Sequence, residues 1–145
     1  MRILLLGKNG QVGWELARSL APFYDVIAPE RNRVDLSQPD TVIDFARSTC
    51  PNIIINAAAY TDVDRAEDDP DTAILINASV SGILAEEAKK SGAVFIHYST
   101  NYVFDGNKNK PYLETDAPNP LGIYGRGKLI GEQNIQSANC NYFIF

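Results

Sequence analysis

The stretch that decides the fold is Gly7-Lys8-Asn9-Gly10-Gln11-Val12-Gly13. It follows the apolar run Ile3–Leu6 and precedes Trp14–Leu20, whose residue pattern indicates a helix. A buried strand, a glycine turn and a helix N-terminus in this order form a site for a nucleotide pyrophosphate, because free N–H groups and the helix dipole attract phosphate. The first glycine permits the sharp turn, the second lets the backbone approach the ligand, and the third lets helix and strand pack closely.

The composition is that of one globular domain. The chain has 145 residues, of which 45% are hydrophobic and 21% charged. Its net charge of −5 argues against a nucleic-acid partner, because no basic patch is available to neutralise phosphates. The N-terminus is itself a core strand and no apolar run reaches membrane-spanning length, so we expect a cytoplasmic protein with no membrane partner. Cys50 and Cys140 lack C-x-x-C spacing and are expected to be reduced thiols, although their positions leave a disulfide open.

Strands and helices are expected to alternate along the chain. Apolar runs predict strands at 2–6, 24–28, 53–55, 93–98 and 141–145, and helical periodicity predicts helices at 10–20, 39–48, 71–90 and 124–137. We expect a short extended piece at 33–36, with Ser37 as the next N-cap, and a long loop at 99–122. The alternation requires right-handed crossovers, and therefore predicts an α/β fold: a Rossmann-type doubly wound parallel sheet with helices on both faces. Ligands of such sheets bind at the carboxyl ends of the strands.

Residues that can carry chemistry follow separate predicted strands. The small residues of Asn56–Ala59 let a cofactor ring lie against the backbone, and the hydroxyl of Thr100 can hydrogen-bond a substrate carbonyl. Tyr124 and Lys128 form a Y-x-x-x-K pair on one helix face. A nearby ammonium group favours deprotonation of a phenol, so this pair can exchange a proton with a substrate oxygen. Such a pair also occurs by chance on many helices, but the four features in chain order indicate an enzyme.

The sequence resembles the extended short-chain dehydrogenase/reductases, and within them the dTDP-4-dehydrorhamnose reductase family. The resemblance is carried by GKNGQVGWEL (7–16), NAAAYTDVDRAE (56–67), HYSTNYVFDG (97–106) and PLGIYGRGKLIGE (120–132), which cover nearly the whole chain. It implies reduction of the C4 keto group of dTDP-4-dehydrorhamnose to dTDP-L-rhamnose by NADH or NADPH. The nucleotide-sugar would be the substrate partner.

The resemblance also implies roles for individual residues. Tyr124 would donate the proton to the C4 oxygen, and Lys128 would bond the nicotinamide ribose and assist Tyr124. Thr100 would orient the carbonyl, with Asn101 near the sugar. The cofactor contacts would be Gly7, Gly10, Gln11, Val12 and Gly13 at the pyrophosphate, Asp35 and Leu36 at the adenine, and Ala59, Tyr60, Thr61 and Tyr98 at the nicotinamide half.

The choice of cofactor stays open between NADH and NADPH. Glu30, just past the second strand, can accept hydrogen bonds from the adenosine ribose and would favour NADH. Arg31 and Arg33 stand nearby and can pair with a 2′-phosphate, which would favour NADPH.

The sequence departs from the family pattern at two positions beside the site. Asn101 replaces the aspartate of the usual S-T-D-Y, and Gly122 replaces the asparagine of the usual P-L-N-x-Y-G. In addition, Gly127 inside the last helix costs about 1 kcal/mol relative to alanine. These features bear on the exact substrate more than on the fold.

Two other functions remain as alternatives. One is a different sugar-nucleotide epimerase or dehydratase of the superfamily, although Asn101 does not supply the carboxylate that a dehydratase would need. The other is a non-catalytic nucleotide-binding regulatory subunit, which would have less need of Thr100, Tyr124 and Lys128 together.

Because family members are roughly twice this length, we expect residues 1–145 to be a truncated NAD(P)-binding Rossmann domain without its C-terminal substrate-binding part. A homodimer of the full-length protein stays open.

Three further features are expected to be structural. The acidic cluster would solvate a loop and favour the following helix N-terminus, without holding a metal; its members are Asp62, Asp64, Glu67, Asp68, Asp69 and Asp71. His97, the single histidine, is expected to be a hydrogen-bonded core residue, and Trp14 to lie in the core or in an interface.

Overall fold

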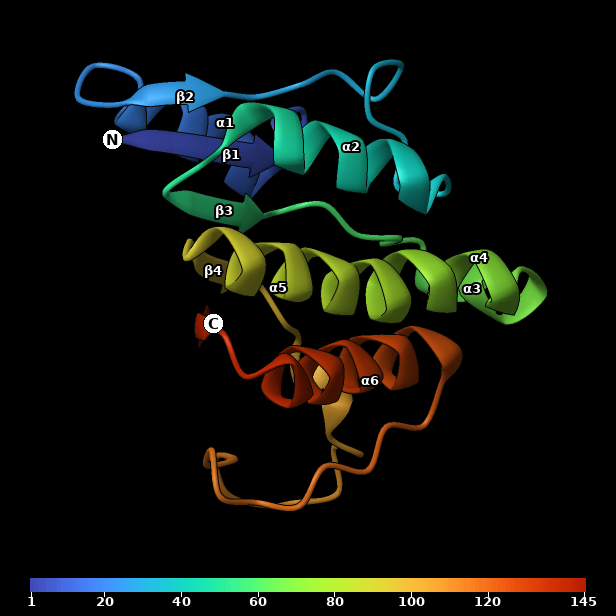
Figure 1. Cartoon of the computed structure of the whole chain (residues 1–145). Coiled ribbons are helices and arrows are strands. Elements are labelled where there is room, and N and C mark those ends of the chain that lie inside the picture. The colour runs from blue at the N-terminus through green and yellow to red at the C-terminus, as the bar shows by residue number, and fades with distance from the viewer.

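The structure, a computed structural model, describes residues 1–145 and is built on one five-stranded sheet. The strands follow the order β2-β1-β3-β4-β5, and every pair is parallel (Figure 1). They span β1 Arg2–Leu6, β2 Asp25–Ile27, β3 Ile53–Asn56, β4 Val94–His97 and β5 Asn141–Ile144. The chain reverses its direction of travel across the sheet between β1 and β3, so the predicted doubly wound α/β fold is confirmed.

Helices cover both faces of this sheet, as predicted. They are α1 Gln11–Leu20, α2 Pro39–Thr49, α3 Val63–Asp68, α4 Pro70–Ile74, α5 Val80–Ser91 and α6 Ile123–Ala138, with a π-helical turn η1 Leu75–Ser79 and a 3₁₀ turn η2 Asn101–Val103. In Figure 1, α2, α5 and α6 lie side by side in front of the strands and α1 lies behind β1. The larger core forms between the sheet and the helices α2, α5 and α6, around Leu4, Ile54 and Phe95.

The smaller core lies on the α1 side of the sheet. Ile3, Leu5 and Ile55 are buried there against Leu16 and Leu20 of α1. Along β1, residues therefore alternate between the two cores, as the side-chain period of a strand requires. This alternation is hidden in the sequence because both faces are apolar, which is typical of parallel strands covered on both sides.

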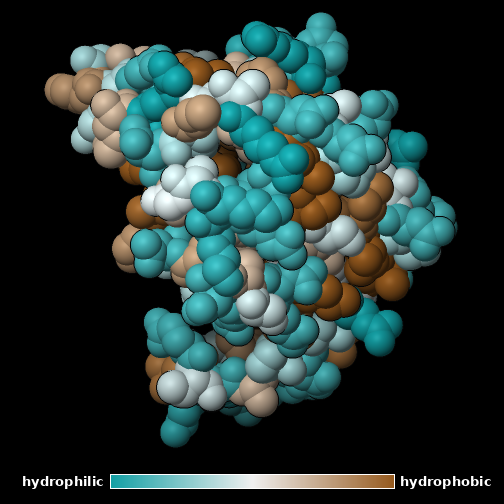
Figure 2. All heavy atoms as spheres, in the orientation of Figure 1, coloured by the Kyte–Doolittle hydropathy of each residue, from teal (hydrophilic) through white to brown (hydrophobic).

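The outer face of the helices is polar. Figure 2 shows that the face formed by α2, α5 and α6 is mostly hydrophilic, with hydrophobic residues in separate patches. None of the helices combines the length and hydropathy needed to cross a membrane.

The prediction of an extended piece at 33–36 was wrong. The N–H of Val34 donates to the carbonyl of Glu30 at 3.1 Å, so the chain turns here. Ser37 does not cap α2 either; its N–H and its hydroxyl both donate to Asp35 Oδ1, at 2.9 and 2.8 Å. The N-cap residue is Gln38, which makes no side-chain capping bond. Short polar side chains compete for nearby backbone N–H groups, and here Asp35 binds the Ser37 N–H that would otherwise lie before the helix.

The single helix predicted for 71–90 is interrupted. It begins at Pro70, passes through the π-helical η1 and continues as α5 to Ser91. The preceding loop also contains an unpredicted helix, α3, whose N-cap Asp62 accepts the N–H of Arg65 at 3.1 Å. Part of the acidic cluster therefore caps a helix within the cluster itself.

Trp14 does not lie in the core, in contrast to one of its two predicted positions. Its side chain is 57% exposed on α1, with the guanidinium of Arg18 at 5.9 Å from the ring centroid. The expectation for His97 is confirmed, since it is fully buried and hydrogen-bonded.

Candidate active site

A cavity of about 640 Å³ opens at the carboxyl ends of β1 and β3. It is bounded by the glycine turn, by the segment that follows β2 and by the residues that follow β3. The predicted cofactor residues that line it are Gly7, Gly10, Asp35, Leu36, Ala59, Tyr60 and Thr61. The predicted cofactor residues outside its lining are Gln11, Val12, Gly13, Glu30, Tyr98 and Lys128. Parallel strands leave a crevice where the strand order reverses, and the cavity occupies that position.

The three glycines of the turn serve different needs. Gly7 has φ +86° and a Cβ there would lie 2.6 Å from the backbone of Ala57, while a Cβ on Gly13 would lie 2.0 Å from the Gly7 carbonyl. Packing of the chain therefore requires both. A Cβ on Gly10 would meet only the Gly7 carbonyl, at 3.4 Å. Nothing in the chain demands glycine at position 10, and the space beside it opens on the cavity.

The N-terminus of α1 faces this turn with its N–H groups uncapped by any side chain. Gly10 is the N-cap residue and has no side chain, so Gln11 and Val12 present their backbone N–H groups at the first turn. Such a helix end attracts phosphate through these N–H groups and through the helix dipole.

Tyr60 supplies an unpartnered hydroxyl beside the cavity. Its oxygen is buried and makes no hydrogen bond of ordinary length and angle, although the Asp69 carboxylate lies nearby. Burial, and next the charge of Asp69, raise the pKa of Tyr60, so the group is a neutral donor. The Asn77 side chain, carried by the π-helical η1, holds the Tyr60 backbone by bonds to its N–H at 2.9 Å and its carbonyl at 3.0 Å. The two bonds from Asn77 thus fix the position of the Tyr60 backbone beside the cavity.

The charged residues that follow β2 divide into two groups. Arg31 and Asp35 line the cavity, with Arg31 Nε 3.9 Å from Asp35 Oδ1. Glu30 instead accepts hydrogen bonds from the side chains of Lys8 and Asn9, each at 2.8 Å, and these contacts lower its pKa. Arg33 stacks over the ring of Phe45, 4.9 Å from the centroid. Of the two arginines predicted near a 2′-phosphate, Arg31 is the one that remains beside the cavity.

Lys128 is buried at the carboxyl end of β4. Its side chain is 2% exposed, and Nζ lies 2.6 Å from the Tyr98 carbonyl and 3.0 Å from His97 Nε2. Burial lowers the pKa of Lys128 to about 8, against a smaller opposite effect of the Glu132 charge. Tyr98 and Lys128, predicted separately, are therefore in direct contact.

Tyr124 lies one turn earlier on α6, against the turn η2. Its ring meets the ring of Tyr102 edge-on, with centroids 5.6 Å apart. Thr100 Oγ1 accepts the N–H of Tyr102 at 3.2 Å, which leaves the Thr100 hydroxyl proton free to donate. A Cβ on Gly125 would lie 2.3 Å from the Tyr102 carbonyl, so this glycine permits the close approach of η2 to α6. Thr100, Asn101 and Tyr124 are thereby brought to one end of the molecule.

Sequence reasoning missed the contribution of Glu67. Its Oε1 accepts the N–H of Ile123 at 2.7 Å and so caps α6 from a different helix. A Cβ at Gly122 would lie 2.7 Å from this oxygen. The glycine in place of the usual asparagine therefore matches a cap supplied by Glu67. Glu67 is the last residue of the 56–67 stretch that carries the family resemblance, but only the fold brings this stretch to the start of α6.

No group of three or more His, Cys, Asp or Glu side chains is arranged to hold a metal ion.

A family model described as RmlD substrate binding domain matches residues 1–145. The chain belongs to this family. The dTDP-4-dehydrorhamnose reductase of Escherichia coli K12 is 50% identical to it over 149 residues, which cover 100% of the chain and 50% of that protein. The resemblance expected from the sequence is confirmed, and the chain spans about half the length of the curated relatives it matches.

Solved structures agree with this assignment. A dTDP-4-dehydrorhamnose reductase from Bacillus anthracis in complex with NADP has a TM-score of 0.93 and 37% identity, covering 99% of this chain and 51% of that one. A UDP-glucose 4-epimerase from Thermus thermophilus in complex with NAD reaches 0.86 at 22% identity, over 99% of this chain and 54% of that one. The epimerase shares the fold, and the likeness carries no more than that.

Proposed function

We propose that the whole protein is an NADH- or NADPH-dependent dTDP-4-dehydrorhamnose reductase and that residues 1–145 are its Rossmann-type cofactor-binding half. Membership of the family supports the activity, because relatives that match the whole chain carry that name. The nucleotide-sugar substrate and a cytoplasmic location are parts of the same proposal. Most substrate contacts would then come from the remaining half of the protein, and pairing of two copies stays a prediction.

The cavity fits a dinucleotide. Gly10 leaves open space where a pyrophosphate would approach the N–H groups of Gln11 and Val12. At the adenosine end, Asp35, Leu36 and Arg31 line the wall. Arg31 can pair with a 2′-phosphate, which supports NADPH. Glu30, expected at the ribose, lies outside the lining, and Asp35 is instead the carboxylate that can accept hydrogen bonds from ribose hydroxyls, so both cofactors remain in the proposal.

The nicotinamide half would lie along the segment after β3. Ala59 and Thr61 line the cavity there, and the unpartnered Tyr60 hydroxyl supports a ligand with a hydrogen-bond acceptor at this point. Tyr98 and Lys128 stand at the end of the neighbouring strand β4. Bound NAD(P)H would supply the hydride for the substrate carbonyl.

The chain's own residues would polarise and protonate that carbonyl. Thr100 donates a hydrogen bond from its free hydroxyl proton and so orients the carbonyl oxygen. Tyr124 donates a proton from its hydroxyl to the same oxygen as the carbonyl becomes an alcohol. Lys128 holds its amino group at the Tyr98 carbonyl, one helical turn from Tyr124, where the charge of its protonated form stabilises the phenolate left behind.

The observation that carries the proposal is the burial of Lys128 at the end of β4, one turn from Tyr124 on a helix packed against Thr100's segment. A buried lysine is costly, and a purely nucleotide-binding subunit gains nothing from it. A dehydratase is disfavoured because exposed Asn101 provides an amide where a carboxylate would be needed.

The test is reduction of dTDP-4-dehydrorhamnose by the whole protein, followed as loss of NADH or NADPH absorbance. Replacing Tyr124 by Phe should lower kcat by about 10²–10⁴-fold, because the proton donor is lost. Cofactor affinity should change less than about twofold, since the ring remains. Tyr24→Phe, at an exposed position before β2, is the matched control and should keep full activity. Full activity in Tyr124→Phe would contradict the assignment.

A further inference from the structure

A chain of four polar contacts runs beneath Lys128. The Ala58 N–H donates to Asn56 Oδ1 at 3.2 Å, and Asn56 Nδ2 lies 3.4 Å from His97 Nδ1. His97 Nε2 lies 3.0 Å from Lys128 Nζ, which in turn lies 2.6 Å from the Tyr98 carbonyl oxygen. Asn56, His97 and Lys128 are 1%, 0% and 2% exposed, so bulk solvent does not reach these contacts.

The direction of each hydrogen bond in this chain follows from the first. A backbone N–H can only donate, so the oxygen of the Asn56 amide faces Ala58 and the NH₂ group faces His97. That NH₂ group also can only donate, so His97 Nδ1 is the acceptor. A neutral imidazole has one donor and one acceptor, which places the proton on Nε2, pointing at Lys128.

Lys128 can accept this proton only as an uncharged amine. An amine has a lone pair for His97 Nε2–H and keeps hydrogens for the Tyr98 carbonyl, whereas an ammonium group has no lone pair. With an ammonium group, Nε2 would accept and Nδ1–H would face Asn56. The amide would then have to turn over, which would set its NH₂ group against the Ala58 N–H.

We propose that Asn56 and His97 are positioning residues that favour the uncharged, proton-accepting form of Lys128. Proton uptake at Lys128 Nζ is coupled to movement of the His97 proton from Nε2 to Nδ1, with His97 neutral in both states. The value of this coupling for catalysis rests on the proposed function, because it assumes that Lys128 assists Tyr124. The hydrogen-bond order itself does not depend on the reaction.

Two titratable groups, Glu132 and His97, lie beside Lys128. Glu132 lies one turn further along α6, where its carboxylate accepts a hydrogen bond from the Ser99 hydroxyl, and its charge opposes deprotonation of Lys128. His97 faces Lys128 from β4, and burial together with the Lys128 charge lowers the pKa of His97 to about 3, which excludes the imidazolium form near neutral pH. The lowered pKa of Lys128, about 8, brings its uncharged form within the working range.

The tautomer of His97 can be measured by ¹⁵N NMR of the imidazole in the whole protein. His97 is the single histidine of residues 1–145, and loss of its signals in His97→Asn identifies them in the whole protein. At about pH 10, well above the lowered Lys128 pKa of about 8, we expect the Nε2–H tautomer. On lowering the pH, we expect conversion to Nδ1–H without an imidazolium signal. The Nδ1–H tautomer at about pH 10, or an equal mixture of the two, would overturn the proposal.

Asn56→Asp should reverse the tautomer. A carboxylate can accept both the Ala58 N–H and a His97 Nδ1–H, so Nε2 becomes an acceptor and the ammonium form of Lys128 is favoured. We expect the Nδ1–H tautomer at about pH 10 and an upward shift of about one pH unit or more in the Lys128 limb of the kcat profile. Retention of Nε2–H in a folded variant would contradict the proposed order.

The control is Asn52→Asp, just before the same strand. Asn52 is exposed and its side-chain oxygen accepts the Arg2 N–H at 2.8 Å, a bond that a carboxylate keeps. The tautomer should not change. Because NMR requires no turnover, failure of the reductase proposal and failure of this one are distinguishable. If Asn56→Asp does not fold, the pH titration of the unmodified protein decides.

Discussion

Glycines of one turn can be required by the chain or by a ligand, and the structure separates the two cases residue by residue. Gly13 sits where a methyl group would overlap the Gly7 carbonyl, so the fold itself excludes alanine there. Gly10 has ordinary clearance from the chain and lines the cavity. The two positions therefore test different properties of the molecule.

Gly10→Ala should weaken cofactor binding without unfolding the protein. The added methyl group would occupy the space proposed for the pyrophosphate, so we expect at least a tenfold rise in the Kd for NADPH. The free energy of unfolding should change by less than about 1 kcal/mol, since φ −81° suits alanine. Gly13→Ala should instead cost about 3 kcal/mol of stability through overpacking. Urea unfolding and NADPH titration measure both; equal loss of stability in the two variants would contradict the distinction.

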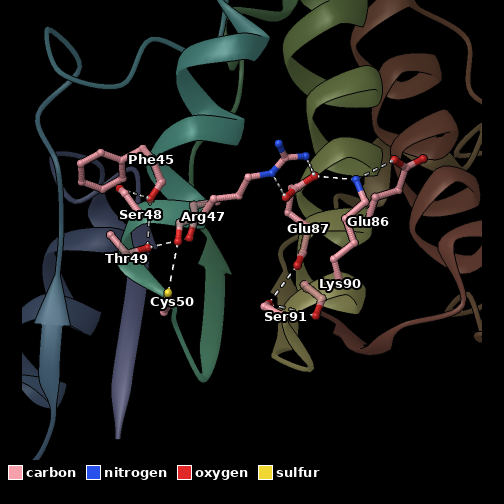
Figure 3. Close-up of polar contacts among 11 residues, drawn as sticks. Phe45, Arg47, Ser48, Thr49, Cys50, Glu86, Glu87, Lys90 and Ser91 are labelled. Carbon is pink, nitrogen blue, oxygen red and sulfur yellow. Dashed lines mark hydrogen bonds and ion pairs between the residues drawn. The ribbon is translucent and has the colours of Figure 1, made fainter.

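At the scale of elements, α2 and α5 are joined by a buried acid (Figure 3). Glu87 of α5 is 5% exposed and accepts from Arg47 Nε at 2.7 Å and Arg47 Nη2 at 2.9 Å. Lys90 Nζ lies 2.6 Å from the same carboxylate. The Arg47 contact, followed by Lys90, lowers the pKa of Glu87 to about 2.

Glu87→Gln should destabilise the protein in a pH-dependent way. Because the folded pKa of Glu87 lies below its ordinary value of 4.5, its contribution is full above about pH 4.5 and is lost as the pH falls towards 2. We expect a loss of about 1–2 kcal/mol at pH 7, limited by solvent screening of the half-exposed Arg47 and Lys90.

Denaturant unfolding of wild type and variant between pH 7 and about 3 measures this difference. Glu86→Gln, at the exposed neighbouring position, is the control and should cost less than about 0.5 kcal/mol. A stability difference for Glu87→Gln that stays constant down to pH 3 would show that the carboxylate charge is not its cause.

At the scale of the whole molecule, the cavity proposed to bind the nucleotide is lined entirely by residues from the first 76 positions of the chain. Its lining residues all lie between Leu6 and Ile76. The residues proposed to meet the substrate, by contrast, stand on η2 and α6, with Asn101 exposed. Cofactor binding and substrate binding should therefore have different requirements for the rest of the protein.

Residues 1–145 alone should bind NADPH but not reduce dTDP-4-dehydrorhamnose. The cavity needs no further chain, whereas productive placement of the sugar would need contacts from the other half, and a misplaced substrate loses most of its rate. Fluorescence titration of NADPH and an absorbance assay of turnover check the two parts. Measurable turnover by residues 1–145, or no binding in a folded sample, would contradict this prediction.

Local patterns in the sequence determined the strand positions, the four long helices and the parallel sheet, because apolar runs, glycine turns and prolines act over a few residues. They also indicated the family. Only the tertiary structure decided the π-helical turn at Leu75–Ser79, which exists where Asn77 binds the Tyr60 backbone. The same holds for Glu67 at the start of α6 and for the burial of Lys128 against His97. Each depends on a partner distant in sequence, and no local pattern carries the identity of that partner. The glycine turn predicts where a phosphate binds; the surroundings of Lys128 depend on the ends of β3 and β4 meeting helix α6.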